Sequence, residues 1–261
     1  MTLARIRFGA FTAIVLAAPA ALMATGDPRL VDLGKLVMIL SPGLAGLILN
    51  RGLGERGARA RWSWVGRSAM VTLAVAIGGL AAALATGAAS LPAEARAANP
   101  ILTAAAVSAL TSVLEELGWA GGGLALAVAA FGRRWGVVIL GLVWAAWHLV
   151  PTVLRVGLFP QLEAAPPLMI AAFVAACLAY RELLTMLRER AGTWLAAAAG
   201  HAAPNILLAG LMAAGVGLSD RPSDWPFFPA PGGLVFLALA LAAVAALRVR
   251  RDPRTPASPR S

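Results

Sequence analysis

Long apolar runs, separated by short polar breaks, recur along the chain and constrain its fold more than any other feature. A helix needs roughly 20 apolar residues to cross the hydrocarbon core of a bilayer, and several runs approach that length. Of the 261 residues, 60% are hydrophobic and 13% are charged, whereas about 25% are charged in soluble domains. We therefore predict an all-α, polytopic membrane helix bundle with about eight transmembrane helices.

The polar breaks set the limits of the predicted spans. These cover approximately residues 8–24, 36–49, 69–90, 101–131, 137–158, 168–187, 194–216 and 233–247. The second is short, so a start nearer Leu30 and a tilted helix are the alternatives. The sequence Ala18-Pro19-Ala20 is similar to a signal-peptidase site, but we favour an uncleaved first span because many spans follow it; cleavage would leave seven. Residues 1–247 then form a single transmembrane domain with a motif core at about 101–216. Residues 248–261 form a basic tail that we expect to be disordered.

Arginine supplies nearly all of the basic residues and clusters at alternate ends of the predicted spans. The segments expected on the cytoplasmic side are residues 1–7, 50–67, 132–136, 181–192 and the tail. Because cytoplasmic loops carry an excess of arginine and lysine, this pattern predicts a multi-pass protein of the cell membrane with both termini in the cytoplasm. The net charge of +10 is explained by topology and contact with anionic lipid. We expect the lipid bilayer as a partner and no nucleic acid.

Two adjacent carboxylates, Glu115 and Glu116, lie inside one of the apolar runs. A charged side chain at the centre of a bilayer costs at least about 2.5–3.5 kcal/mol on insertion scales, and such residues mark functional sites or polar networks. Partners are therefore expected, and the two histidines of the chain, His148 and His201, also lie in apolar runs. This coincidence indicates a shared polar site inside the bundle.

Residues four positions apart share one face of a helix. This spacing forms three pairs, each in a different span: Glu115 with Trp119, Trp144 with His148, and His201 with Asn205. Pro204 removes a backbone hydrogen bond near Gly200, so we expect a free carbonyl close to His201. Gly118 and Gly122 have the same spacing and predict close helix packing.

Two histidines and a carboxylate fit two kinds of hydrolytic chemistry. The first is a zinc site with Glu115, His148 and His201 as ligands and an open position for water. The second needs no metal: a glutamate and a histidine deprotonate water, while the remaining histidine and Asn205 stabilise an oxyanion. The single cysteine, Cys177, excludes a cysteine zinc site.

Depth in the membrane is a point against a shared site. Counted from the nearest cytoplasmic arginine at 1.5 Å per residue, His148 lies at ~21 Å, His201 at ~16 Å and Glu115 at ~27 Å. The sequence therefore predicts that Glu115 lies farther from the cytoplasm than the two histidines. Strong helix tilt, or a break at Gly121-Gly122-Gly123, would bring them together.

Three motifs, in a fixed order on three spans, resemble the CPBP family of CAAX proteases and bacteriocin-processing enzymes, also called Abi proteins. The motifs are Glu115-Glu116-Leu117-Gly118-Trp119, Trp144-x-x-Trp147-His148 and His201-x-x-x-Asn205. The resemblance covers about Ser108 to Leu208. It implies an intramembrane endopeptidase in which Glu115 activates water with His148. It also implies that His201 and Asn205 bind the metal or the oxyanion, and that Glu116 supports the site.

One position departs from the family pattern. The first motif of the family usually has an arginine five residues after its first glutamate, where this chain has Ala120. An arginine there would pair with a carboxylate or position the helix. The resemblance implies a peptide or membrane-protein substrate, and either zinc or a metal-free site. The alternative is a non-proteolytic membrane transporter or scaffold that retains the helical frame.

Overall fold

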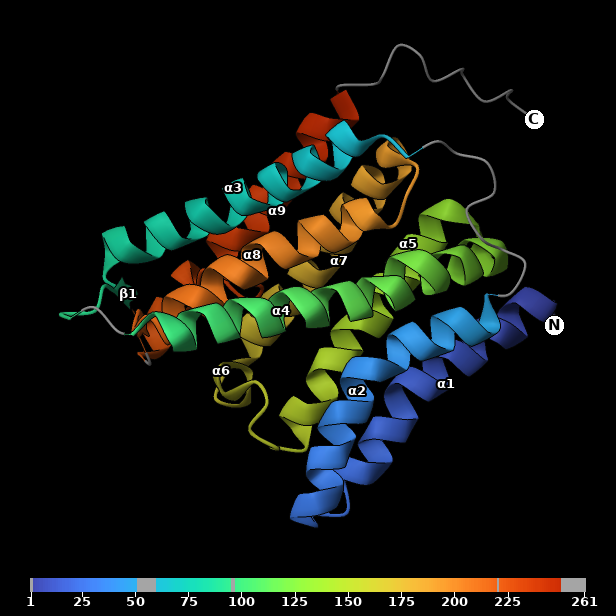
Figure 1. Ribbon diagram of the computed structural model, residues 1–261, viewed down its shortest axis with the longest axis horizontal. Coiled ribbons are helices and arrows are strands. Elements are labelled where there is room, and N and C mark those ends of the chain that lie inside the picture. Colours follow the sequence, from blue (N-terminus) through green and yellow to red (C-terminus); the bar gives the residue numbers. More distant parts are fainter. Residues whose placement is uncertain (1, 51–59, 95–96, 220, 250–261) are drawn as a thin grey trace.

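The computed structural model describes residues 2–50, 60–94, 97–219 and 221–249 (Figure 1). Most of these residues are helical. The α-helices are α1 (Leu3–Met23), α2 (Pro28–Leu49), α3 (Trp62–Thr86), α4 (Ala98–Gly118), α5 (Leu124–Val153), α6 (Pro160–Glu163), α7 (Pro167–Ala191), α8 (Leu195–Ala213) and α9 (Leu234–Val249). A π-helix, η1 (Trp119–Gly123), joins α4 to α5, and a 3-10 helix, η2 (Pro222–Phe227), precedes α9.

Six helices in the described ranges are long and apolar enough to cross a membrane. The longest, Ala98–Val153, makes two passes, because its backbone leaves the helical region at Gly132 (φ 74°, ψ 165°). A side chain at Gly136 would collide with the backbone of Ala127, so the two arms pack closely after the turn. With α9 as a shorter apolar helix, the predicted all-α bundle of about eight spans is confirmed.

The central helices of the bundle come from distant parts of the chain. Helix α8 packs against both α4 and α3, while α9 packs against α7 and α3. Helices α1 and α2 form a hairpin that contacts the rest through α5 and α4 (Figure 1). Gly46 of α2 faces Gly118 and Gly122, where a side chain would strike the neighbouring backbone. The close packing predicted from these two glycines is thus present, and it presses α2 against the site-bearing end of α4.

Two helix starts differ from the sequence prediction. Helix α2 begins at Pro28, close to the alternative start near Leu30 and before residue 36, because the Asp27 side chain caps it by accepting hydrogen bonds from the Arg29 and Leu30 amides. Helix α3 begins at Trp62, inside the predicted cytoplasmic loop. Residues 51–59 of that loop, and residues 250–261 of the predicted tail, lie outside the described residues.

The loops at the end of the bundle opposite the amino terminus contain short helices and strands. Strand β1 (Ala89–Ser90) pairs antiparallel with β2 (Gly217–Leu218), with Ala89 opposite Leu218. The predicted loop between the fifth and sixth spans contains α6, and Leu162 of α6 is buried. These connections lie over one end of the bundle and cover the site described next.

Candidate active site

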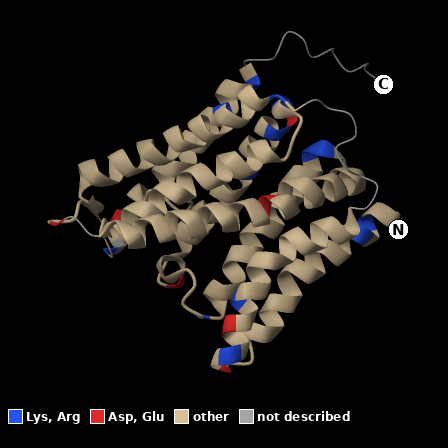
Figure 2. Ribbon diagram, viewed as in Figure 1, with Lys and Arg blue, Asp and Glu red and all other residues tan. Residues whose placement is uncertain are grey.

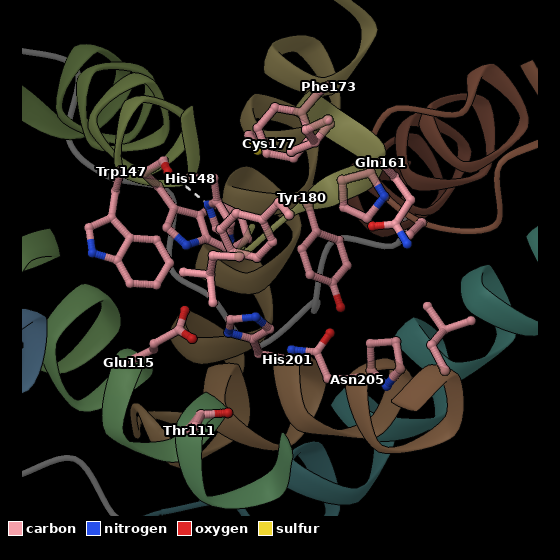
Figure 3. Close-up of a pocket in the computed structure, with 18 of the residues that line it drawn as sticks. Thr111, Glu115, Trp147, His148, Gln161, Phe173, Cys177, Tyr180, His201 and Asn205 are labelled. Carbon is pink, nitrogen blue, oxygen red and sulfur yellow. Dashed lines mark hydrogen bonds between the residues drawn. The ribbon is translucent and has the colours of Figure 1, made fainter. Parts of the chain in front are cut away.

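A cavity of about 380 Å³ lies among α2, α4, α5, α7, α8 and α9. Four of the five predicted site residues line it: Glu115, His148, His201 and Asn205. Figure 3 shows the Glu115 carboxylate and the two imidazole rings turned toward the same space, with Asn205 beside His201. The predicted difference in depth is therefore wrong. The helices are not parallel, as Figure 1 shows, so residue counts along different helices do not give comparable depths.

Glu115 lines the cavity, and one oxygen of its carboxylate has no hydrogen bond to the described residues. Its side chain comes from the last turn of α4, and the residue is 8% exposed. Its Oε2 atom is buried and has no hydrogen-bond partner of good geometry among the described residues. A buried polar atom without a partner costs free energy and indicates a missing water or ligand. Glu115 thus lines the cavity, while its Oε2 atom is enclosed by neighbouring protein groups.

His148 is held in one tautomer by its own helix. Its Nδ1 atom lies 3.0 Å from the carbonyl oxygen of Trp144 (Figure 3), and because a carbonyl only accepts, Nδ1 carries the hydrogen. In the neutral ring, Nε2 is then left as an acceptor. Aromatic rings surround the imidazole, and Trp147 is nearest at 4.7 Å between centroids, followed by Phe159 at 5.3 Å and Phe173 at 5.6 Å.

Glu116 does not line the cavity and is fully buried behind it. Its Oε1 atom lies 3.0 Å from Nδ1 of His201. The carboxylate also accepts two hydrogen bonds from the Arg181 guanidinium, at 2.8 and 3.0 Å. We refer to Glu116, Arg181 and the Nδ1 edge of His201 as the ionic layer. Because its carboxylate is bidentate and charge-paired, the ionic layer fixes the His201 ring and leaves Nε2 for the cavity.

Arg181 was placed wrongly by the sequence analysis, which assigned it to a cytoplasmic segment. The residue is 1% exposed, and its guanidinium also lies 4.2 Å from the ring centroid of Trp144. Helix α7 continues to Ala191, and the arginines of its last turn are Arg188 and Arg190. Arg181 therefore lies within the span, where only a carboxylate such as Glu116 compensates the cost of its charge.

The guanidinium on Glu116 thus comes from α7, whereas the family's motif arginine would stand at Ala120. Ala120 is buried in η1 and offers no charge. Arg181 thus supplies, from another helix, the positive charge that position 120 lacks. An arginine seven residues before the helix-terminal Arg188 was the signal available.

Asn205 and Pro204 behave as their spacing predicts. The Asn205 side-chain amide donates to the hydroxyl of Ser112 on α4, at 3.0 Å. Its second N–H has no described acceptor and remains for a molecule in the cavity. The carbonyl of Gly200, freed by Pro204, accepts a hydrogen bond of 2.8 Å from Tyr180, which also lines the cavity. Tyr180 and Ser112 were not identified from the sequence, because single hydroxyls in apolar runs carry no distinctive spacing.

The zinc site predicted from Glu115, His148 and His201 stays a prediction. Within the described part of the chain, no three His, Cys, Asp or Glu side chains are grouped so as to hold a metal ion. The Nδ1 atoms of both histidines have protein partners, which leaves both Nε2 atoms for the cavity, and Trp144 packs edge-on against both rings, at 5.3 and 5.4 Å.

Residues 97–207 match the family model described as type II CAAX prenyl endopeptidase Rce1-like. The matched segment begins at the start of α4 and ends in α8, so it contains all three motifs and the ionic layer. The predicted resemblance to the CPBP family is confirmed over this segment, and it supports a membrane-embedded endopeptidase of the CAAX type. No curated protein shows significant similarity to the chain.

Proposed function

We propose that this chain, whose residues 97–207 carry the Rce1-like core, is an intramembrane endopeptidase that hydrolyses a peptide bond with a water molecule activated by Glu115 and His148. The observation that carries the proposal is the common cavity. Two histidines and a carboxylate from three helices line it, and each histidine has its Nδ1 atom occupied by the protein. Such preset ring nitrogens are typical of general acid–base sites.

In the proposed reaction, the carboxylate of Glu115 and the Nε2 atom of His148 accept the two hydrogens of one water molecule. Glu115 takes a proton as the water oxygen attacks the scissile carbonyl carbon. The C–N bond then breaks, and the same proton passes from Glu115 to the leaving nitrogen. The products are a carboxylic acid and an amine, and transfer of the acid's proton to the amine gives a carboxylate and an ammonium group, so protons balance over the cycle.

The negative charge that develops on the carbonyl oxygen requires donors. The second N–H of Asn205 provides one, because its first is held by Ser112. His201 provides the other when Nε2 is protonated, since Glu116 accepts from Nδ1 and stabilises the resulting imidazolium. In this proposal Glu116 acts through His201 and does not touch the substrate.

The cavity walls indicate the kind of substrate. Apart from the polar residues at its inner end, the lining is largely apolar and aromatic, including Phe159, Leu162, Phe173, Phe228 and Phe236. An apolar segment of a membrane-anchored peptide suits these walls, because burying it releases it from water or lipid headgroups. We therefore propose a membrane-anchored peptide or protein as the substrate.

The test is cleavage of membrane-anchored peptides by the purified protein in lipid vesicles, with products identified by mass spectrometry. Glu115→Gln should lower the rate by about 10²–10⁴-fold, because the amide takes no proton. Glu94→Gln, at an exposed position, is the matched control and should leave the rate unchanged. Equal rates for the wild type and Glu115→Gln would overturn the proposal.

A further inference from the structure

The cavity is closed at the end where most arginines lie. The inner lining residues on α7 and α8 are Tyr180 and His201. One turn farther toward the arginine-bearing ends of these helices, Leu184 and Ala197 are both fully buried. On the neighbouring α5, Leu140 is also fully buried, one turn from the lining residue Trp144. The ionic layer and these buried side chains close the cavity at this end.

From this closed end, the residues that line the cavity extend in one direction only. On α7 it passes from Tyr180 through Cys177 to Phe173, toward the start of the helix. On α8 it passes from His201 through Asn205 to Leu208, toward the end of the helix. Both directions lead to the same end of the bundle, where the α5–α7 and α8–α9 connections lie (Figure 1).

The loops between α5 and α7 and between α8 and α9 form the rim of the cavity at that end. Gln161 and Phe228 line the cavity and also line a second cavity of about 320 Å³. The second cavity is more polar, and its lining includes Ser219, Arg221 and Asp224. Hydrogen bonds from Ser219 and Ser223, together with the Arg221 guanidinium, hold the pKa of Asp224 below its ordinary value. Charged groups at this rim indicate contact with water.

The charges of the described residues distinguish the two ends of the bundle (Figure 2). The closed end has Arg5, Arg7, Arg61, Arg67, Arg133, Arg134, Arg188, Arg190 and Arg248, with Glu182 and Glu189. The rim end has Arg29, Lys35, Arg155 and Arg221, with Asp27, Asp32, Glu94, Glu163 and Asp224. By the positive-inside rule, the closed end is cytoplasmic and the rim end is not.

We infer that the site takes its substrate from the non-cytoplasmic side of the membrane, through the rim at Gln161 and Phe228. The apolar cavity receives the segment that is cleaved, and the polar second cavity receives the chain as it continues into water. The substrate class is therefore a membrane-anchored peptide whose cleavable segment lies at the extracytoplasmic surface. This inference rests on the proposed function for the cleavage step, but the direction of opening does not depend on it.

Cysteine labelling tests the direction of opening without requiring activity. Cys177 is the single cysteine, so Gln161→Cys is made in a Cys177→Ala background. A membrane-impermeant maleimide should label it in spheroplasts and not in inverted vesicles. Arg134→Cys, exposed at the closed end, should show the reverse, and Leu91→Cys, 69% exposed at the rim end, should match Gln161→Cys. Labelling of Gln161→Cys only in inverted vesicles would overturn the inference.

A reporter assay tests the side from which substrate is taken. A single-span reporter with its cleavable segment outside should be cut at least tenfold faster than the same reporter inverted. Faster cutting of the inverted reporter would contradict the inference while leaving the protease proposal intact. If Gln161→Cys is labelled from outside but neither reporter nor purified peptide is cut, the proposed function fails and the direction of opening stands.

Discussion

Glu115 and Glu116 are adjacent in the sequence, yet they belong to two regions of opposite character. Glu116 lies in the ionic layer, where Arg181 and His201 occupy both carboxylate oxygens. Glu115 lies in the cavity, where Oε2 has no partner among the described residues. Successive helical residues point about 100° apart, so one helix serves both regions. The comparison indicates that Glu116 holds His201 in position, whereas Glu115 is the carboxylate that reacts with water in the proposed mechanism.

The largest expected effect comes from breaking the ionic layer. Arg181→Leu leaves Glu116 charged and buried without a guanidinium, which should lower the free energy of unfolding by about 3–5 kcal/mol. Denaturant unfolding in detergent micelles, followed by circular dichroism, measures the loss. Arg133→Leu is the matched control, because its ion pairs with Glu182 and Glu189 are exposed and should contribute less than about 1 kcal/mol.

A second variant sharpens the same comparison. Arg181→Leu combined with Glu116→Leu removes both charges, so most of the lost stability should return. Cleavage should stay low, because His201 no longer has an acceptor at Nδ1. Full activity in this double variant would show that the ionic layer has no part in positioning His201.

An intermediate effect is expected at Asn205, which lines the cavity one helical turn from His201. Asn205→Ala should lower kcat by about 10²-fold with little change in KM, because an oxyanion donor acts mainly in the transition state. Ser112→Ala removes the partner of Asn205 on α4 without removing the amide. Equal losses in both variants would mean that Asn205 only joins the two helices. Steady-state cleavage kinetics in vesicles distinguish the two roles.

The smallest effect is expected from removing metal ions. Because no described group of three His, Cys, Asp or Glu side chains is arranged to hold a metal, dialysis against a chelator should leave the cleavage rate unchanged. Elemental analysis of the same sample should find less than one zinc per chain. Loss of activity on dialysis and its return with added zinc would contradict this expectation.

Sequence patterns identified the fold and the cavity residues, because helix periodicity and the cost of membrane-buried charge act locally. The i, i+4 pairs placed His148, His201 and Asn205 on faces that do line the cavity. The patterns failed for Arg181, since an arginine near a helix end is usually a topology signal. Only the pairing of α7 with α4 across the bundle reveals that Glu116 needs it. Relative depth failed for the same reason, because helix tilt is a tertiary property.

The most direct test of the account is to substitute the adjacent glutamates one at a time. Cleavage rate and unfolding midpoint are measured for Glu115→Gln and Glu116→Gln under identical conditions. We predict that Glu115→Gln lowers the cleavage rate by about 10²–10⁴-fold, with its midpoint unchanged or raised, because Oε2 of Glu115 is buried without a hydrogen bond to the described residues. Glu116→Gln should lower the midpoint, because Arg181 is left without its counter-charge. A Glu115→Gln variant that cleaves normally, or that unfolds as readily as Glu116→Gln, would contradict the division between the two regions.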